Sequence, residues 1–251
     1  MKLRYFLLVV FMTSLVLPVF AAEWLDEFEG PDLHEEWVKI TWRPVEQGTA
    51  IIEDGQLLIN GLGDFGHLIT DGRPLVLRKA PKGDFSISML VDTEPPAPAA
   101  SYWIGLFVIG EDGDDAVMAH NWAAANIGGG PNEVKLLIGS MIDGAWNDKG
   151  HFDVPEWPLH IKLEKVGAQY TGYFKEKVTD EWTKVGAAWS HAGMEDPVLV
   201  GIGFINNWAG GPDLTLIADY FSLEGNSVAS MAVQPMDKLP GMWGRIKAAA
   251  E

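Results

Sequence analysis

From Glu23 to Gly225 the sequence is a succession of short apolar runs separated by turn residues, with no helical period lasting beyond two turns. Asp54-Gly55 and Asp143-Gly144 each separate two such runs, and Asp-Gly between strand-like segments is a strong hairpin signal. Regular short strands are typical of antiparallel sandwiches and barrels, whereas the lack of helices excludes alternating β-α units. We therefore predict an all-β fold of two antiparallel sheets.

The segment Asp213–Gly225, DLTLIADYFSLEG, is predicted to be a strand inside a sheet because apolar residues occur on both of its alternating faces. Uninterrupted alternation places Leu214, Leu216, Ala218, Tyr220 and Ser222 on one face and Thr215, Ile217, Asp219, Phe221 and Leu223 on the other. We expect this strand to pair with the segment that begins at Glu23, which would close one domain between the first and last strands.

The N-terminus has the composition of a secretory signal peptide. Lys2 and Arg4 precede an apolar run of about thirteen residues, which is shorter than the roughly 20 residues that span a bilayer. Val19 and Ala21 suit the cleavage motif, so we predict a signal peptide over 1–21, a secreted (extracellular or periplasmic) sandwich domain over 22–225, and a linker with a short tail over 226–251. The tail pattern is compatible with a short helix that either docks on the sandwich or attaches a protein partner.

The net charge and the cysteine content limit the kinds of partner and the sources of stability that the protein can have. The chain has 18 basic and 35 acidic residues, a net charge of −17, and no cysteine. Nucleic acid and anionic lipid are poor partners for such a surface, and no membrane span is expected. Without disulfides or thiolate metal sites, stability must come from the core.

Four motifs carry a resemblance to a known family. They are Asp26-x-Phe-x-Gly-Pro-x-Leu-x-x-x-Trp37, the hairpin Asp54-Gly-x-Leu57, the segment Gly83–Ser88 (GDFSIS), and the segment Ala218–Gly225 (ADYFSLEG). Together they make the chain from Glu23 to Gly225 resemble the concanavalin A-like, laminin-G-type jelly rolls. The bacterial "regulation of enolase" type of domain and the sandwich appended to some β-xylosidases are the nearest forms. The resemblance implies two antiparallel sheets, one of them concave, and frequent association with carbohydrates, but no single activity.

Glycoside hydrolysis needs two carboxylates at a fixed separation. Hydrolases of this fold that resemble laminarinases carry Glu-x-Asp-x-x-Glu on one strand, and this sequence has no such run. The acidic clusters Glu111–Asp115 and Glu176–Glu181 are predicted to lie in turns, and no Gly-x-Ser-x-Gly or Ser-His-Asp arrangement is recognisable. We expect no catalytic residues and a carbohydrate-recognition or adhesion module. The alternatives are an extracellular glycoside hydrolase with an unrecognised acid pair and a structural protein-interaction domain.

Polysaccharide or glycan binding needs flat aromatic faces together with planar polar groups. Two stretches repeat this chemistry, since Asn121-Trp122 and Asn207-Trp208 each precede a Gly-Gly-Pro segment. If each pair ends a strand and both ends lie at one rim, they form one site with two aromatic plates. The predicted site contains Asn121, Trp122, Trp146, Asn207, Trp208 and Asp213. The other interpretation is that these tryptophans fill the core.

A structural calcium ion is the cofactor that the acidic residues suggest, because calcium takes several oxygen ligands. Asp26, Glu29 and Asp219 are the candidate ligands near the paired termini, and Asp112, Asp114 and Asp115 form a second candidate turn. Solvated surface carboxylates are the alternative for both groups.

Overall fold

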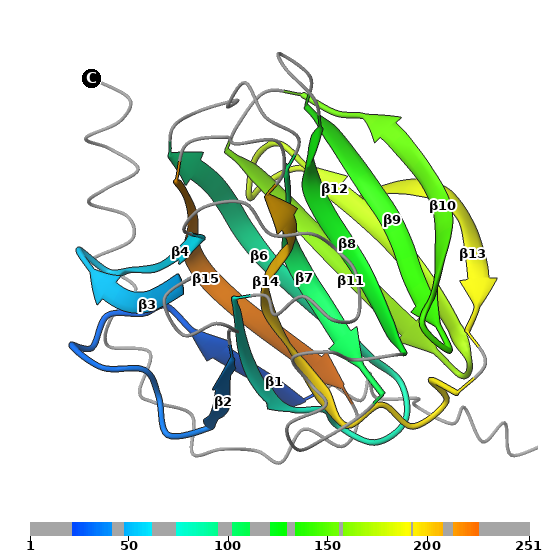
Figure 1. Cartoon of the computed structure of the whole chain (residues 1–251), viewed down its shortest axis with the longest axis horizontal. Coiled ribbons are helices and arrows are strands. Elements are labelled where there is room, and N and C mark those ends of the chain that lie inside the picture. The colour runs from blue at the N-terminus through cyan, green and yellow to red at the C-terminus, as the bar shows by residue number, and fades with distance from the viewer. Residues whose placement is uncertain are drawn as a thin grey trace, which may run out of the picture.

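The computed structural model describes residues 22–41, 48–61, 74–94, 102–110, 121–129, 134–155, 158–191, 193–207 and 213–225. Their regular structure consists of strands, arranged as two antiparallel sheets stacked on each other (Figure 1), which confirms the predicted all-β sandwich. Among these residues there is no helix long and apolar enough to cross a membrane. The predicted signal peptide, the tail, Trp208 and the acidic turn 111–115 lie outside the described residues.

One sheet has eight strands in the order β13-β12-β11-β6-β15-β4-β3, with β1 also paired to β15. Its strands are β1 (Ala22–Asp26), β3 (Gly48–Glu53), β4 (Gln56–Gly61), β6 (Phe85–Glu94), β11 (Leu159–Val166), β12 (Gln169–Lys175), β13 (Thr183–Ser190) and β15 (Leu214–Gly225). The other sheet has seven strands in the order β10-β9-β8-β7-β14-β5-β2. They are β2 (Trp37–Thr41), β5 (Leu75–Lys79), β7 (Tyr102–Ile109), β8 (Trp122–Gly129), β9 (Lys135–Ile142), β10 (Ala145–Asp153) and β14 (Leu199–Asn207).

Strand β15 lies inside its sheet, as predicted, and it pairs with the first strand. Ala22–Asp26 run antiparallel to Phe221–Gly225, and β4 pairs with the preceding half of β15 along the same edge. The predicted division of its faces is correct only as far as Ala218. A bulge between Ala218 and Tyr220 inserts Asp219 and reverses the alternation, so Phe221 and Leu223 join the core instead of Tyr220 and Ser222.

The opening motif forms an aromatic box at one end of the sandwich. Trp24, Trp37 and Phe221 have ring centroids 5.1 to 6.1 Å apart and make edge contacts. Asp26 organises this box, because its Oδ1 accepts the backbone N–H of Phe28 at 2.9 Å and its Oδ2 accepts Trp37 Nε1–H at 2.7 Å. The spacing of Asp26, Phe28 and Trp37 in the sequence is therefore explained by packing and hydrogen bonding.

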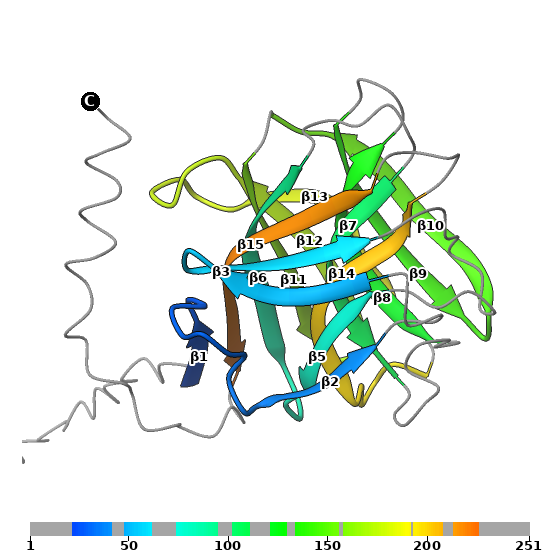
Figure 2. The same cartoon turned by 60° about the vertical axis from the view of Figure 1, so that its left-hand side comes forward.

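Apolar residues form two buried layers. The larger fills the space between the sheets, and the smaller lies on the outer face of the seven-stranded sheet, where it includes Trp103, Phe107, Trp122, Leu137 and Met141. Antiparallel sheets usually have one polar outer face, so this second layer is unusual. The turned view in Figure 2 brings forward β3 and β2, the strands at one end of each sheet.

The composition of Asn126–Asn132 (NIGGGPN) predicts a loop, but the part that the structure describes, Asn126–Gly129, is in a strand. It is the second half of β8, which pairs with β7 along its whole length and with β9 as far as Gly128. Glycine occurs here because two neighbouring strands approach closely: a Cβ on Gly128 would lie 1.8 Å from the carbonyl oxygen of Tyr102. Strand β8 therefore lies inside its sheet, between β9 and β7. Gly128 is needed there because the backbone of β7 approaches it closely.

Candidate functional site

The predicted sugar-binding residues that the structure describes do not lie together. In the seven-stranded sheet Trp122 pairs with Ile109, at one end of β7, whereas Asn207 pairs with Tyr102, at the other end. Seven steps along a strand correspond to about 24 Å. Asp213 precedes β15 on the same side as Asn207, so the predicted set divides into Asn121, Trp122 and Trp146 at one end and Asn207 and Asp213 at the other.

Trp122 is part of the buried layer. Its side chain is 1% exposed, and its ring lies 5.7 Å from Phe107 and 5.5 Å from Trp146 between centroids. Because β8 begins at Trp122, the residue starts a strand instead of ending one. A ring so enclosed offers no free face to a sugar, so of the two interpretations the structure favours the core for Trp122.

Trp146 is the accessible aromatic residue of this group. It is 37% exposed, lies on β10 and faces outward beside Trp122. The Trp146 ring lies against Gly139 of β9. If Gly139 carried a side chain, its Cβ would lie only 3.0 Å from Trp146 Cη2. Asn121 holds the neighbouring turn, because its Oδ1 accepts the backbone N–H of Asp143 at 3.0 Å. Asn121 therefore positions the β9–β10 hairpin that presents Trp146.

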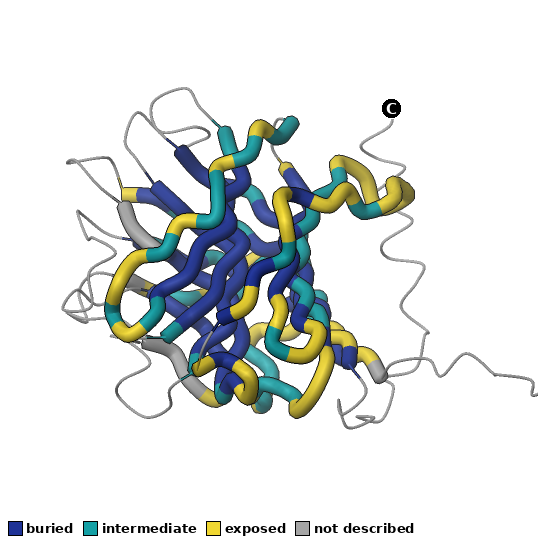
Figure 3. The backbone as a smooth tube through the Cα atoms, turned by 90° about the vertical axis from the view of Figure 1, so that its right-hand side faces the viewer, coloured by how far each residue is buried: buried dark blue, intermediate teal, exposed yellow. Residues whose placement is uncertain are grey.

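Strand β10 brings two further polar groups to the same face. The pairing of β10 with β9 shifts between Asp148 and Gly150, so Lys149 is bulged and Trp146, Asp148 and His151 all face outward. His151 Nε2 lies 3.1 Å from Asp148 Oδ2, and the two side chains are 43% and 42% exposed. In Figure 3, which faces this side of the molecule, exposed and intermediate residues border a dark blue interior.

Trp103 connects this edge to the buried layer of the sheet. Its ring centroid lies 4.9 Å from that of His151. Trp146, Asp148, His151 and Trp103 thus lie on one face of the sheet, which we name the β10 face. The sequence predicts Trp146 as part of a site but not Asp148 or His151, because a bulge at Lys149 places these two residues on one face and simple alternation would separate them.

The predicted calcium ligands occupy separate positions. Both oxygens of Asp26 accept hydrogen bonds, Glu29 is exposed in the turn after β1, and Asp219 is the bulged residue of β15. Within the described ranges there is no group of three or more His, Cys, Asp or Glu side chains that could hold a metal ion. The structure therefore offers no assembled calcium site in this part of the chain.

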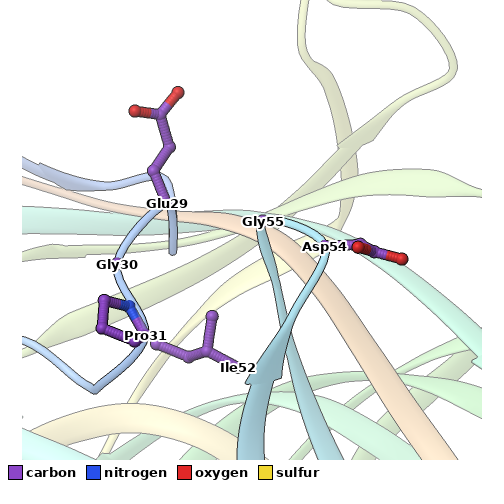
Figure 4. A pocket seen from close by; sticks show the side chains of 6 residues that line it. All are labelled: Glu29, Gly30, Pro31, Ile52, Asp54 and Gly55. Atoms are coloured by element: carbon purple, nitrogen blue, oxygen red, sulfur yellow. The ribbon is translucent and has the colours of Figure 1, made fainter.

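A shallow pocket lies between the turn after β1 and the β3–β4 hairpin. Its lining includes Glu29, Pro31, Ile52 and Asp54 (Figure 4). The two carboxylates point away from each other in this view, so they do not converge on one ligand position. Polar recognition in this pocket would have to come mainly from backbone groups, and the pocket ranks below the β10 face as a candidate site.

No protein-family model matches the chain. No curated protein matches it either. Solved structures do match, and they include xylan β-1,4-xylosidase from Bacillus halodurans C-125 (17% identity, TM-score 0.60) and the GH43 protein BlXynB from Bacillus licheniformis (16% identity, TM-score 0.62). Each match covers 80% of this chain but only 38% and 39% of the respective enzyme chains.

A third similar structure is the CBM2 module of the evolved Dit protein of Lactobacillus casei BL23 phage J-1. The match has 10% identity and a TM-score of 0.54, and it covers 84% of this chain and 99% of that module. At these identities the matches establish the fold. A similar β-sandwich thus occurs as part of a longer xylosidase chain and as a module of a phage protein.

Proposed function

We propose that the protein is a secreted, non-catalytic glycan-binding module and that the β10 face is its binding surface. The observation that carries the proposal is a half-exposed tryptophan in line with a carboxylate and an imidazole on one strand. The indole ring can stack on the apolar face of a sugar ring, and Asp148 and His151 can exchange hydrogen bonds with its hydroxyl groups.

The dimensions of the β10 face suit a short stretch of a polysaccharide. Successive residues of a strand are about 3.3 Å apart, so Trp146 and His151 are separated by about 15 Å. Both belong to an antiparallel hairpin joined to the centre of the sheet, which holds them at a fixed spacing. Such a row selects a ligand that runs along β10 and contacts several groups at once.

The similar structures support a glycan as the ligand class. They include part of a xylan β-1,4-xylosidase and a module designated CBM2. A binding role without catalysis is supported by Asp148, the carboxylate of the β10 face as defined above, because it is engaged with His151 and glycoside hydrolysis needs two carboxylates.

Replacement of Trp146 tests the proposal. We expect Trp146→Ala to weaken retention in affinity gels containing neutral polysaccharides by at least about tenfold, and Trp146→Phe to weaken it less, because a smaller ring face remains. Val38→Ala is the control, since Val38 is 52% exposed and lies on β2 at the far edge of the same sheet.

Equal retention of Trp146→Ala and Val38→Ala would refute the β10 face as the binding surface. Release of reducing sugar from the same polysaccharides by the wild-type protein would favour the hydrolase alternative. Thermal unfolding of each variant shows whether a loss of binding is independent of a loss of folding.

A further inference from the structure

The outer face of the eight-stranded sheet holds two lysine ammonium groups against one indole ring. Lys162 Nζ lies 4.8 Å and Lys175 Nζ lies 4.7 Å from the ring centroid of Trp182. Lys162 Nζ is also 4.4 Å from the ring centroid of Tyr173, its cross-strand partner. These side chains come from β11, β12 and the residue before β13, so adjacent elements at one edge of the sheet converge here.

Neither ammonium group forms an ion pair with a residue that the structure describes. Lys175 Nζ donates to the carbonyl oxygen of Val178 at 2.8 Å, whereas no described residue accepts a hydrogen bond from Lys162 Nζ. The adjacent carboxylate of Glu164 already accepts the hydroxyl of Tyr173 at 2.7 Å. Lys162 Nζ therefore keeps hydrogen-bond donors that the described residues do not use, although it is partly buried.

The two ammonium groups lie close enough to act on each other and on a neighbouring histidine. Burial is the main cause that lowers the pKa of Lys162; the carboxylates of Glu164 and Glu224 raise it, and Lys175 makes a smaller contribution that lowers it. His160 is paired with Lys175 across the strands, and its pKa is lowered to about 4 by burial first and by Lys175 second. An anion placed between the two ammonium groups would relieve this repulsion.

We propose that Lys162, Lys175, Tyr173 and Trp182 bind a carboxylate group carried by a mostly neutral glycan. Two ammonium donors can hold one carboxylate, and the bordering aromatic rings can contact the apolar side of the sugar that carries it. All four side chains are partly exposed, so the site is open to solvent. This site lies on the opposite sheet from the β10 face and goes beyond the function proposed there.

A polyanion fits this site poorly. Glu164 and Glu224 border the cluster, and the whole chain carries a net charge of −17. Both would repel a polymer with a charge on every unit. A neutral backbone with scattered acidic side groups presents one carboxylate to the lysines without bringing others near the acidic surface.

A matched pair of ligands tests the proposal on the wild-type protein. Glucuronoxylan carries isolated carboxylates, and its carboxyl-reduced form has the same backbone with neutral hydroxymethyl groups in their place. We expect calorimetric titration to give at least about tenfold tighter binding of glucuronoxylan, because a charge-assisted hydrogen bond contributes at least that factor. Free glucuronate should compete with it and free glucose should not. Equal binding of the two polymers, or binding of neither, would overturn the proposal.

Variants that remove one lysine charge test whether the preference for glucuronoxylan arises at the lysine cluster. Lys162→Met and Lys175→Met keep an apolar stem, and each should weaken glucuronoxylan binding by about tenfold while leaving binding of the carboxyl-reduced form unchanged. Lys79→Met makes the same charge change at an exposed residue on β5 of the other sheet and should have no effect. Lys175→Arg should retain most of the affinity, because a guanidinium also binds carboxylates.

The variants also separate this proposal from the β10 face. Trp146→Ala should weaken binding of the carboxyl-reduced form, which lacks the acid groups, whereas the lysine variants should remove only the additional affinity for glucuronoxylan. Lysine variants that fold but bind glucuronoxylan as Lys79→Met does would refute the assignment. If a variant does not fold, the comparison of the two polymers on the wild-type protein decides the question.

Discussion

Acidification tests how His160 is held in the folded protein. This side chain is buried on the outer face of β11, and its Nδ1 lies 3.0 Å from the hydroxyl oxygen of Tyr220. Burial first, and Lys175 second, lower the pKa of His160 from 6.5 to about 4, with Asp180 acting in the opposite direction. As the pH falls, the unfolded chain therefore takes up this proton before the folded protein does. The contribution of neutral His160 to stability is complete above about pH 6.5 and is lost as the pH approaches 4.

The size of the effect follows from the two pKa values. A folded pKa of about 4 against 6.5 in the unfolded chain removes about 2.5 kcal/mol of stability by about pH 4.5. His160→Gln abolishes this titration but weakens the hydrogen bond to Tyr220, which costs about 1 kcal/mol. The wild type should therefore be more stable by about 1 kcal/mol at about pH 7, and the variant by about 1.5 kcal/mol at about pH 4.5.

Urea unfolding followed by tryptophan fluorescence at several pH values measures this crossover. Carboxylates that titrate in the same range are common to both proteins, so their contributions cancel in the difference. Val38→Ala is the control, because Val38 is exposed and the substitution changes no ionisable group. Parallel stability curves for wild type and His160→Gln between about pH 7 and 4.5 would refute this account of His160.

Two further substitutions test the packing interpretation of residues that the sequence offered as ligands. Trp122→Ala should lower the free energy of unfolding by about 3 to 5 kcal/mol in guanidinium titrations, because the ring is buried against Phe107; a loss under about 1 kcal/mol would contradict its burial. Asp26→Asn should cost about 2 to 3 kcal/mol, because the new amide group cannot accept from both Phe28 N–H and Trp37 Nε1–H. Calorimetric unfolding measures this cost, and an unchanged transition would show that the two hydrogen bonds contribute little.

Most of the fold could be predicted from short-range features of the sequence. Asp54 and Asp143 have φ values of 52° and 48°, and the glycines that follow them have 76° and 77°. Positive φ at both central residues is the geometry of the type I′ turn, for which Asp-Gly is a preferred sequence. These turns depend on adjacent residues alone, so the sequence was enough to place both hairpins.

Features that depend on distant pairing could not be predicted in the same way. The bulge at Asp219 reverses the face of every later residue in β15, and nothing in the local alternation marks it. Asn126–Gly129 have a loop-like composition, but Gly128 is required by the close approach of Tyr102 from another strand. The separation of Trp122 from Asn207 likewise follows from the register of β7 with its two neighbours.

The positions of the two proposed surfaces limit how the protein can engage a polymer. The β10 face belongs to the outer side of the seven-stranded sheet, and the lysine cluster belongs to the outer side of the eight-stranded sheet. Stacked sheets are about 10 Å apart, and the side chains on their outer faces point in opposite directions. A stiff glycan chain lying along β10 therefore cannot also lie along β11 and β12. Simultaneous use of both surfaces requires two chains or two distant segments of one flexible chain, so avidity should depend on the density of the polymer network.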